Sequence, residues 1–109
     1  MAAGVQYPNV IDLVSHDPKS DVVTLSMIEQ RPWDGSKERI IQLQTKIQNY
    51  VGFALDGQFA KAYPSYVGKP LEIALRCPSA PDETTSKFLA EIGRRLEAYK
   101  IALVVRLLK

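Results

Sequence analysis

Two segments of the chain carry apolar residues at steps of three and four, and this spacing constrains the fold more than any other feature of the sequence. Within residues 37–56 the repeated positions are Ile40, Leu43, Ile47, Tyr50 with Val51, and Ala54 with Leu55. Within residues 82–99 they are Phe88, Leu89, Ile92, Leu96 and Tyr99. Because this period places apolar side chains along one side of a helix, both segments are predicted to be amphipathic helices that pack against another layer.

The residues that flank the two segments are typical of helix ends. Asp34 and Ser36 can each cap the first helix by accepting a hydrogen bond from a free N–H group, and Gly57 suits the left-handed residue that ends it. Asp82 favours the start of the second helix through the helix dipole. The polar residues of the first helix, Lys46 among them, lie largely off its apolar stripe.

Four runs of residues are typical of β-strands. Residues 10–14 and 22–28, joined by the turn-forming residues 16–21, predict a β-hairpin. Residues 71–77 alternate in polarity, with their odd-numbered residues directed to the helices. Residues 101–108 are apolar on both faces, which favours an interior strand over an exposed edge.

The element order ββαβαβ predicts the fold class. A strand–helix–strand unit prefers a right-handed crossover, so two units that wind in one direction place both helices on the same side of the sheet. We therefore expect an α/β (α+β) two-layer sandwich, with a four-stranded mixed sheet and two helices on one face; the order of the strands stays open. With 46% hydrophobic and 24% charged residues, residues 1–109 are expected to form a single domain.

The connection between the first helix and residues 71–77 is rich in large aromatic side chains. Residues 58–69 contain Phe59, Tyr63 and Tyr66, and Pro64 interrupts any regular element. These residues predict an ordered connection, anchored by its aromatic side chains and able to include a helical turn.

One face of the predicted sheet has no helix to cover it. Its outward positions are more apolar than a hydrated face requires; they are Val22, Thr24, Ile28, Glu72, Ala74, Arg76, Ala102, Val104 and Leu108. Because a contiguous apolar patch commonly marks an interface, we expect a homodimer through the open sheet face, or another protein partner there. The alternative is a monomer in which Glu72, Arg76 and Arg106 keep the face hydrated.

No group of residues has the spacing of a catalytic, cofactor-binding or metal site. His16 lies beside a carboxylate, which suits a general base, but it falls in the predicted turn, where a solvent-exposed role is the simpler interpretation. Cys77 is predicted to be a small buried hydrophobic residue. Trp33 and Asp34 precede the first helix without a glycine-rich phosphate loop. One cysteine and one histidine cannot supply the usual metal ligands, so neither a metal nor a cofactor is expected.

Asp12 is a charged residue within an apolar strand-like run. A buried carboxylate without a partner is costly. The sequence therefore leaves two options, in which the side chain either faces solvent or is held by a buried partner.

Charge and cysteine content bear on partners and compartment. The net charge of +2 is too small to indicate a nucleic-acid partner, and no run approaches the ~18 consecutive apolar residues that span a membrane. A single cysteine cannot form an internal disulfide, which fits a reducing compartment, and residues 1–9 lack the pattern of a signal peptide. We therefore expect a cytoplasmic protein that binds neither nucleic acid nor membrane.

A set of residues spread over nearly the whole chain resembles a known family. It comprises Val10-Ile11-Asp12, Trp33-Asp34, Leu43-Gln44-x-Lys46-Ile47-x-Asn49-Tyr50-x-x-Phe53, Gly57-Gln58, Tyr63-Pro64, Gly68, Pro81 and Phe88. This set resembles a family of short bacterial α/β proteins of unknown function, most specifically in the first helix and at Tyr63-Pro64; Gln48 and Gly52 depart from its pattern. The resemblance implies a small bacterial α/β protein and transfers no catalytic residue.

These features favour a non-enzymatic protein-interaction or homodimerising module. The alternative is a small-ligand-binding protein or an enzyme, with a pocket between Trp33, the start of the first helix, and Tyr63 with Tyr66. A structure that shows a closed, filled space around Trp33, Tyr63 and Tyr66 removes that alternative.

Overall fold

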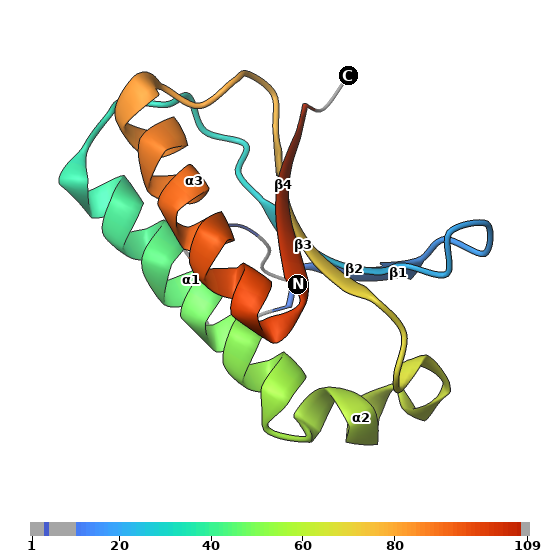
Figure 1. Cartoon of the computed structure of the whole chain (residues 1–109). Coiled ribbons are helices and arrows are strands. Elements are labelled where there is room, and N and C mark those ends of the chain that lie inside the picture. The colour runs from blue at the N-terminus through green and yellow to red at the C-terminus, as the bar shows by residue number, and fades with distance from the viewer. Residues whose placement is uncertain (1–3, 5–10, 108–109) are drawn as a thin grey trace.

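The computed structural model describes residue 4 and residues 11–107. Four strands in this part of the chain form one mixed sheet (Figure 1). They are β1 (Leu13–His16), β2 (Val23–Ile28), β3 (Leu71–Cys77) and β4 (Ile101–Leu107), and they lie side by side in that order. β1 pairs with β2 antiparallel, whereas β2 with β3 and β3 with β4 are parallel. The predicted hairpin and the predicted mixed sheet are therefore confirmed.

Two long helices cover one face of this sheet. α1 (Lys37–Leu55) and α3 (Glu83–Leu96) lie on the same side, as Figure 1 shows, which confirms the predicted two-layer sandwich. The predicted second helix over residues 82–99 ends earlier, because its last three residues tighten into the 3₁₀ turn η2 (Glu97–Tyr99) before the left-handed Lys100. In the described part of the chain, none of the helices is long and apolar enough to cross a membrane.

The helix ends follow the expected capping chemistry. Ser36 caps α1 by accepting a hydrogen bond from Arg39 N at 3.2 Å, whereas Asp34 accepts from Ser36 N and thus supports the cap instead of forming it. Asp82 caps α3 by accepting from Thr85 N at 3.2 Å. Gly57 follows α1 with a φ of 95°, a left-handed conformation that favours glycine.

The connection over residues 58–69 is ordered, as predicted. It contains α2 (Gln58–Ala62) and the 3₁₀ turn η1 (Pro64–Tyr66). Its aromatic rings form a row, with centroid distances of 5.7 Å between Phe59 and Tyr63 and 5.9 Å between Tyr63 and Tyr66. These contacts join the parts of the connection to one another, and the ring of Tyr66 also stacks on His16 of β1.

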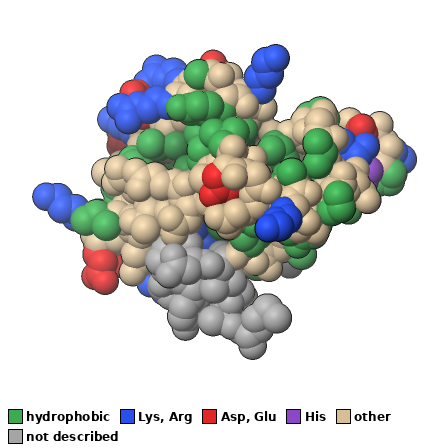
Figure 2. Space-filling view, turned by 90° about the horizontal axis from the view of Figure 1, so that it is seen from below, with side chains coloured by type: hydrophobic (Ala, Val, Ile, Leu, Met, Phe, Trp, Pro, Cys, Tyr) green, Lys and Arg blue, Asp and Glu red, His purple; other side chains and the backbone are tan. Residues whose placement is uncertain are grey.

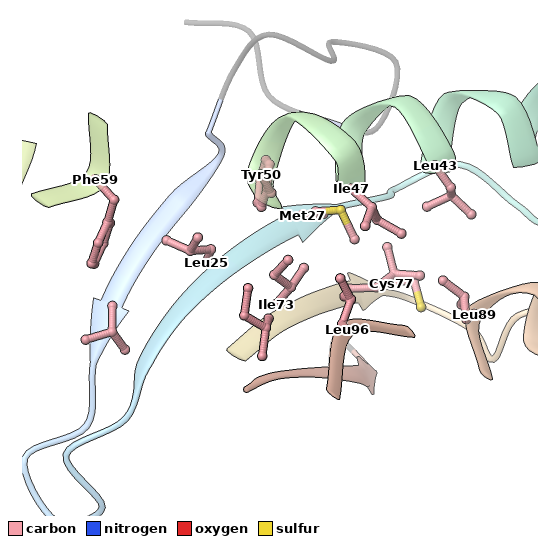
Figure 3. Close-up of a cluster of buried hydrophobic side chains, with 13 residues drawn as sticks. Leu25, Met27, Leu43, Ile47, Tyr50, Phe59, Ile73, Cys77, Leu89 and Leu96 are labelled. Atoms are coloured by element: carbon pink, nitrogen blue, oxygen red, sulfur yellow. The ribbon is translucent and has the colours of Figure 1, made fainter. Parts of the chain in front are cut away.

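The hydrophobic core lies between the sheet and the two long helices (Figure 3). Strand alternation directs the odd-numbered residues of β2 and β3 to the helices, where they meet the apolar stripes of α1 and α3. The buried side chains include Val23, Leu25, Met27, Leu43, Ile47, Tyr50, Phe59, Ile73, Leu75, Cys77, Leu89 and Leu96. The burial of Cys77, with no exposed surface, confirms its prediction as a core residue.

Two strand predictions are wrong in detail. Among the described strands β4 is an edge strand and not an interior one, because β2 occupies one side of β3 and the crossover through α3 returns the chain to the other side. β1 starts later than the predicted residues 10–14 and includes His16; Val10 lies outside the described residues. The shift has a local cause, since Asp12 N donates to the Tyr50 hydroxyl and so is not available to the strand ladder.

Candidate functional site

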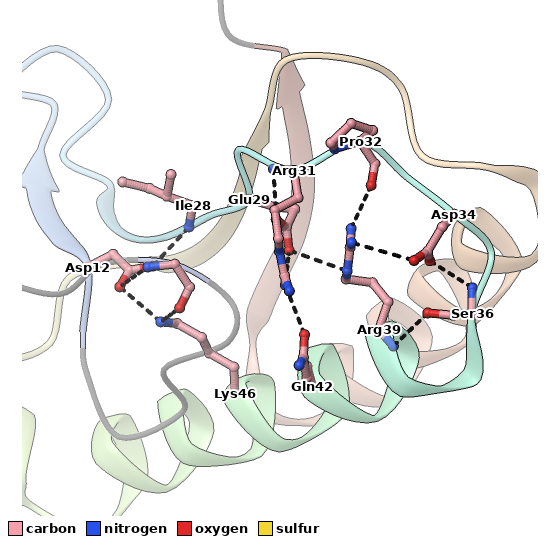
Figure 4. A network of polar contacts seen from close by, with 11 residues as sticks. Asp12, Ile28, Glu29, Arg31, Pro32, Asp34, Ser36, Arg39, Gln42 and Lys46 are labelled. Atoms are coloured by element: carbon pink, nitrogen blue, oxygen red, sulfur yellow. Dashed lines mark hydrogen bonds and ion pairs between the residues drawn. The ribbon is translucent and has the colours of Figure 1, made fainter.

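A buried ion pair joins the start of the described segment to the middle of α1 (Figure 4). The side chains of Asp12 and Lys46 are both fully buried, with Lys46 Nζ 2.9 Å from Asp12 Oδ1. Lys46 Nζ also donates to Gly4 O at 2.6 Å, and Asp12 Oδ2 accepts from Ile28 N at 2.9 Å. Of the two options that the sequence left for Asp12, the buried partner is the correct one, and this role of Lys46 escaped the sequence analysis.

Tyr50 completes this part of the network. Its hydroxyl donates to Ser26 O at 2.6 Å and accepts from Asp12 N at 2.9 Å. Burial raises the pKa of the Tyr50 phenol well above its ordinary value of 10.0, so the side chain remains protonated and able to donate. A signal for the network existed in the sequence, because Lys46 and Tyr50 lie one turn apart on the side of α1 that carries Leu43.

A second buried carboxylate lies where β2 ends. Glu29 is fully buried and accepts from Arg31 through its backbone N at 3.0 Å, Nε at 2.8 Å and Nη2 at 2.7 Å. Arg39 Nε lies 3.8 Å away, and Gln42 accepts from Arg31 (Figure 4). Burial works to raise the pKa of Glu29, but the hydrogen bonds from Arg31 outweigh it and the pKa lies below its ordinary value.

These buried groups fasten the two layers to each other. Among the described residues, every buried side-chain nitrogen and oxygen has a hydrogen-bond partner. A catalytic acid or base needs access to a substrate, and the partners of Asp12 and Glu29 occupy them fully. We therefore assign the network a structural role.

His16 ties the hairpin to the aromatic connection. Its Nε2 lies 2.8 Å from Asp21 Oδ1, which also accepts from Lys69 Nζ at 2.7 Å, and its ring stacks on Tyr66 with a centroid distance of 5.2 Å. The prediction of a solvent-exposed turn residue is wrong, because β1 extends to His16 and its ring is largely covered. Figure 2 shows the histidine at the end of the molecule, beside acidic and basic side chains.

The described residues place Trp33 far from Tyr63 and Tyr66, so these three side chains do not line one pocket as predicted. Trp33 precedes α1, whereas both tyrosines follow it, and a helix of 19 residues separates its ends by roughly 28 Å. Trp33 Nε1 donates to Ser79 O at 2.9 Å, and the guanidinium of Arg39 lies 5.6 Å from the centre of its ring. The tyrosines lie beside His16 instead.

The other predicted candidates have no exposed chemistry. Cys77 is buried, and burial raises the pKa of its thiol, which disfavours the reactive thiolate. Within the described ranges, no cluster of histidine, cysteine and carboxylate side chains has the geometry of a metal site.

Polar side chains on the open face of the sheet form hydrogen bonds with one another. Thr24 donates to Glu72 at 2.8 Å, Arg106 Nη1 donates to the same Glu72 oxygen at 2.6 Å, and Arg76 Nε donates to Ser26 at 3.0 Å. These contacts fit the alternative in which Glu72, Arg76 and Arg106 keep the face hydrated. Leu108, which was expected on this face, lies outside the described residues.

The β1–β2 hairpin projects on this side of the sheet, away from α1 and α3 (Figure 1). Between the hairpin end and the sheet lies a hollow of about 450 Å³, here called the open-face hollow. It is lined by Ser15, His16, Asp17, Ser20, Val22, Thr24, Glu72, Arg76 and Arg106.

The second open surface is the free side of β4. Val105 and Leu107 are 41% and 55% exposed there, on the strand face that α3 only partly covers. A groove of about 340 Å³ runs between α3 and β4. Its lining is mostly apolar or small and comprises Pro81, Ser86, Leu89, Ala90, Gly93, Leu103 and Val105. We call this strand edge with its groove the β4 edge.

Comparison with known proteins identifies one family. The model of a family of unknown function (DUF6572) matches residues 3–109, which is nearly the entire chain. No curated protein and no solved structure matches the chain.

Proposed function

The chain belongs to the DUF6572 family, whose function is unknown, and we propose that it is a non-enzymatic interaction module that pairs with a second copy of itself through the β4 edge. The observation that carries this proposal is the free, apolar edge of β4. An edge strand offers unpaired peptide groups to another strand, and natural proteins usually cover or charge such an edge.

The peptide groups at the free edge belong to the odd-numbered residues of β4. Glu29 N donates to Arg76 O at 2.9 Å, which shows that the peptide group of Arg76 points to the β2 side of β3. Because peptide groups alternate in direction along a strand, the even-numbered residues of β3 bond to β2 and its odd-numbered residues bond to β4. With Ile73 aligned to Leu103, the even-numbered residues of β4 bond to β3 in a parallel ladder. The groups left at the edge are those of Ile101, Leu103, Val105 and Leu107.

A two-fold axis at Val104 uses these groups without conflict. In an antiparallel pair of β4 strands, Leu103 of one copy lies opposite Val105 of the other, and Ile101 lies opposite Leu107. Apolar side chains thereby meet apolar side chains on the helix side. On the open side Arg106 lies opposite Ala102, so like charges are kept apart.

The same axis sets the two α3 helices antiparallel. Asp82 and Glu83 lie at the start of α3, and Arg94 and Arg95 lie in its last turn. The acidic start of one helix therefore approaches the basic end of the other, which is charge complementarity of the kind that selects a partner. The small residues of the groove leave room for apolar side chains of the second copy.

Light scattering on an eluting size-exclusion peak tests the proposal. We expect the wild type to approach twice the 12.2 kDa chain mass as its concentration rises through the micromolar range. Val105→Glu, which places a charge opposite Leu103, is expected to elute at the single-chain mass. Ile41→Glu is the matched control, because Ile41 is 54% exposed on α1, and it is expected to keep the wild-type mass.

A backbone variant separates edge pairing from general loss of apolar surface. Val105→Pro removes an N–H group that β3 does not use, and proline is tolerated on an edge strand. Circular dichroism verifies its fold. A wild type that keeps the single-chain mass at hundreds of micromolar, or a Val105→Pro variant that dimerises like Ile41→Glu, contradicts the proposal.

A further inference from the structure

We propose that the open-face hollow binds an oxyanion group, a carboxylate or phosphate carried by a small molecule, through the guanidinium of Arg76. This inference goes beyond the proposed self-association and depends on a different surface. Its starting point is the distribution of charge on the open face of β3 and β4.

Arg76 is a half-buried cation whose hydrogen-bond partner is neutral, and the carboxylate of Glu72 acts on it only through space. Among the described residues its hydrogen bond is from Nε to the Ser26 hydroxyl, and no carboxylate forms an ion pair with it. The two terminal nitrogens of the guanidinium therefore retain their donors. A charge that is partly removed from water gains more from a counter-ion than an exposed one does.

A second cation lies beside Arg76 on the next strand. The register aligns Arg76 of β3 with Arg106 of β4, so the two arginines lie on neighbouring strands of one face, and both line the open-face hollow. Like charges in such positions repel each other. The nearby Glu72 is already engaged, because Arg106 and Thr24 both donate to its Oε1. An oxyanion between the two guanidinium groups relieves the remaining repulsion.

The hollow suits a small ligand in size and in hydrogen-bonding groups. Its volume of about 450 Å³ lies within the usual range for small-molecule sites. The planar fork of arginine matches the oxygens of a carboxylate or a phosphate. Ser15 and Ser20 add hydroxyl groups along the wall that the hairpin forms.

The same hollow disfavours a polyanion. Asp17 and Glu72 also line it, and the net charge of the chain is only +2. A nucleic acid would carry several phosphates past these carboxylates, whereas a compact ligand can place a single anionic group at Arg76. We therefore commit to a small molecule as the ligand class.

Titrations followed by ¹H–¹⁵N NMR test the site, with sodium phosphate and sodium acetate as probes and sodium chloride at matched ionic strength as the reference. We expect phosphate, acetate or both to shift the Nε–H resonance of Arg76 and the amide of Ser26 in a saturable way that chloride does not reproduce. A preference for phosphate identifies a phosphate ligand, and equal or stronger binding of acetate identifies a carboxylate. Shifts that are absent or matched by chloride overturn the proposal.

Arginine variants distinguish a site from general attraction to a basic surface. Arg76→Gln is expected to weaken binding about tenfold or more, because a charge-assisted pair is lost, and Arg76→Lys is expected to restore part of it. Lys37→Gln, at an exposed position where α1 begins, is the matched control and is expected to bind like the wild type. Equal losses in Arg76→Gln and Lys37→Gln contradict the site. Repeating the titration with Val105→Glu keeps the result independent of self-association.

Discussion

Asp12 and Lys46 bury two opposite charges between α1 and the segment before β1, and each requires the other. Moving a charge out of water costs several kcal/mol, which the mutual attraction and the surrounding hydrogen bonds offset only while both partners are present. Asp12 also accepts hydrogen bonds from Gly4 N and Ile28 N, and these bonds fix its position. The pair therefore specifies how this segment docks on α1 more than it adds to net stability.

Removing one member of the pair is expected to be far more harmful than removing both. Lys46→Met leaves the Asp12 carboxylate buried without a cation, and we expect a loss of about 3–5 kcal/mol in the free energy of unfolding. The double variant Asp12→Asn with Lys46→Met is expected to recover part of this loss. Urea denaturation of both measures the coupling.

An exposed lysine is the control for this experiment. Lys87 pairs with Glu83 on the surface of α3, and Lys87→Met is expected to change stability by less than about 1 kcal/mol. A Lys46→Met variant that is no less stable than Lys87→Met contradicts the structural role of the buried pair.

At the scale of elements, Glu29 joins the end of β2 to α1 through Arg31, Arg39 and Gln42. The pKa of Glu29 is lowered below its ordinary value of 4.5 in the folded protein, since its arginine contacts favour the ionised form despite burial. Its contribution to stability is therefore fully present above about pH 4.5. It declines as the pH falls through the folded pKa, where the native carboxylate takes up a proton.

Glu29→Gln is expected to unfold about 1–3 kcal/mol more easily than the wild type at pH 7, because it leaves the buried donors of Arg39 and Arg31 poorly matched. Urea denaturation at several pH values measures the difference. We expect it to shrink as the pH falls below about 4.5, where the wild type loses its own charge. A difference that stays constant down to pH 2 contradicts this account, and Glu97→Gln at an exposed position serves as the control at pH 7.

The elements also show which parts of the fold follow from local pattern. The periods of α1, α3 and β3 predicted their positions to within a few residues, since local spacing decides which face is apolar. Position in the sheet was not predictable in this way. β4 is apolar on both faces, as interior strands are, yet it lies at the edge, because strand order depends on which side of β3 is free.

At the scale of the whole molecule, α1 and α3 cover one face of the sheet, and the open-face hollow and the β4 edge lie outside that cover. Self-association through the β4 edge links folding to concentration, because a dimer stabilises the folded chain by mass action. The two surfaces meet at Arg106, whose strand forms the edge and whose side chain reaches Glu72.

The melting temperature is therefore expected to rise by several degrees as the wild-type concentration increases a hundredfold. Differential scanning calorimetry or circular dichroism measures the shift. Val105→Glu is expected to melt at a temperature that does not depend on its concentration, whereas Ile41→Glu follows the wild type. A wild-type melting temperature that is constant over this range argues against the dimer.

The sequence by itself determined the two helices, the hairpin and the central strands, because hydrophobic period is a local property. It also determined that both helices lie on one side of the sheet, because the element order with right-handed crossovers requires it. Only the tertiary structure decided that Lys46 is buried against Asp12, that Trp33 and Tyr66 lie at opposite ends of α1, and that Arg76 is aligned with Arg106 on the neighbouring strand. Each of these depends on residues far apart in the chain. Their distances are set by how the layers pack and how the strands are ordered, which local spacing does not encode.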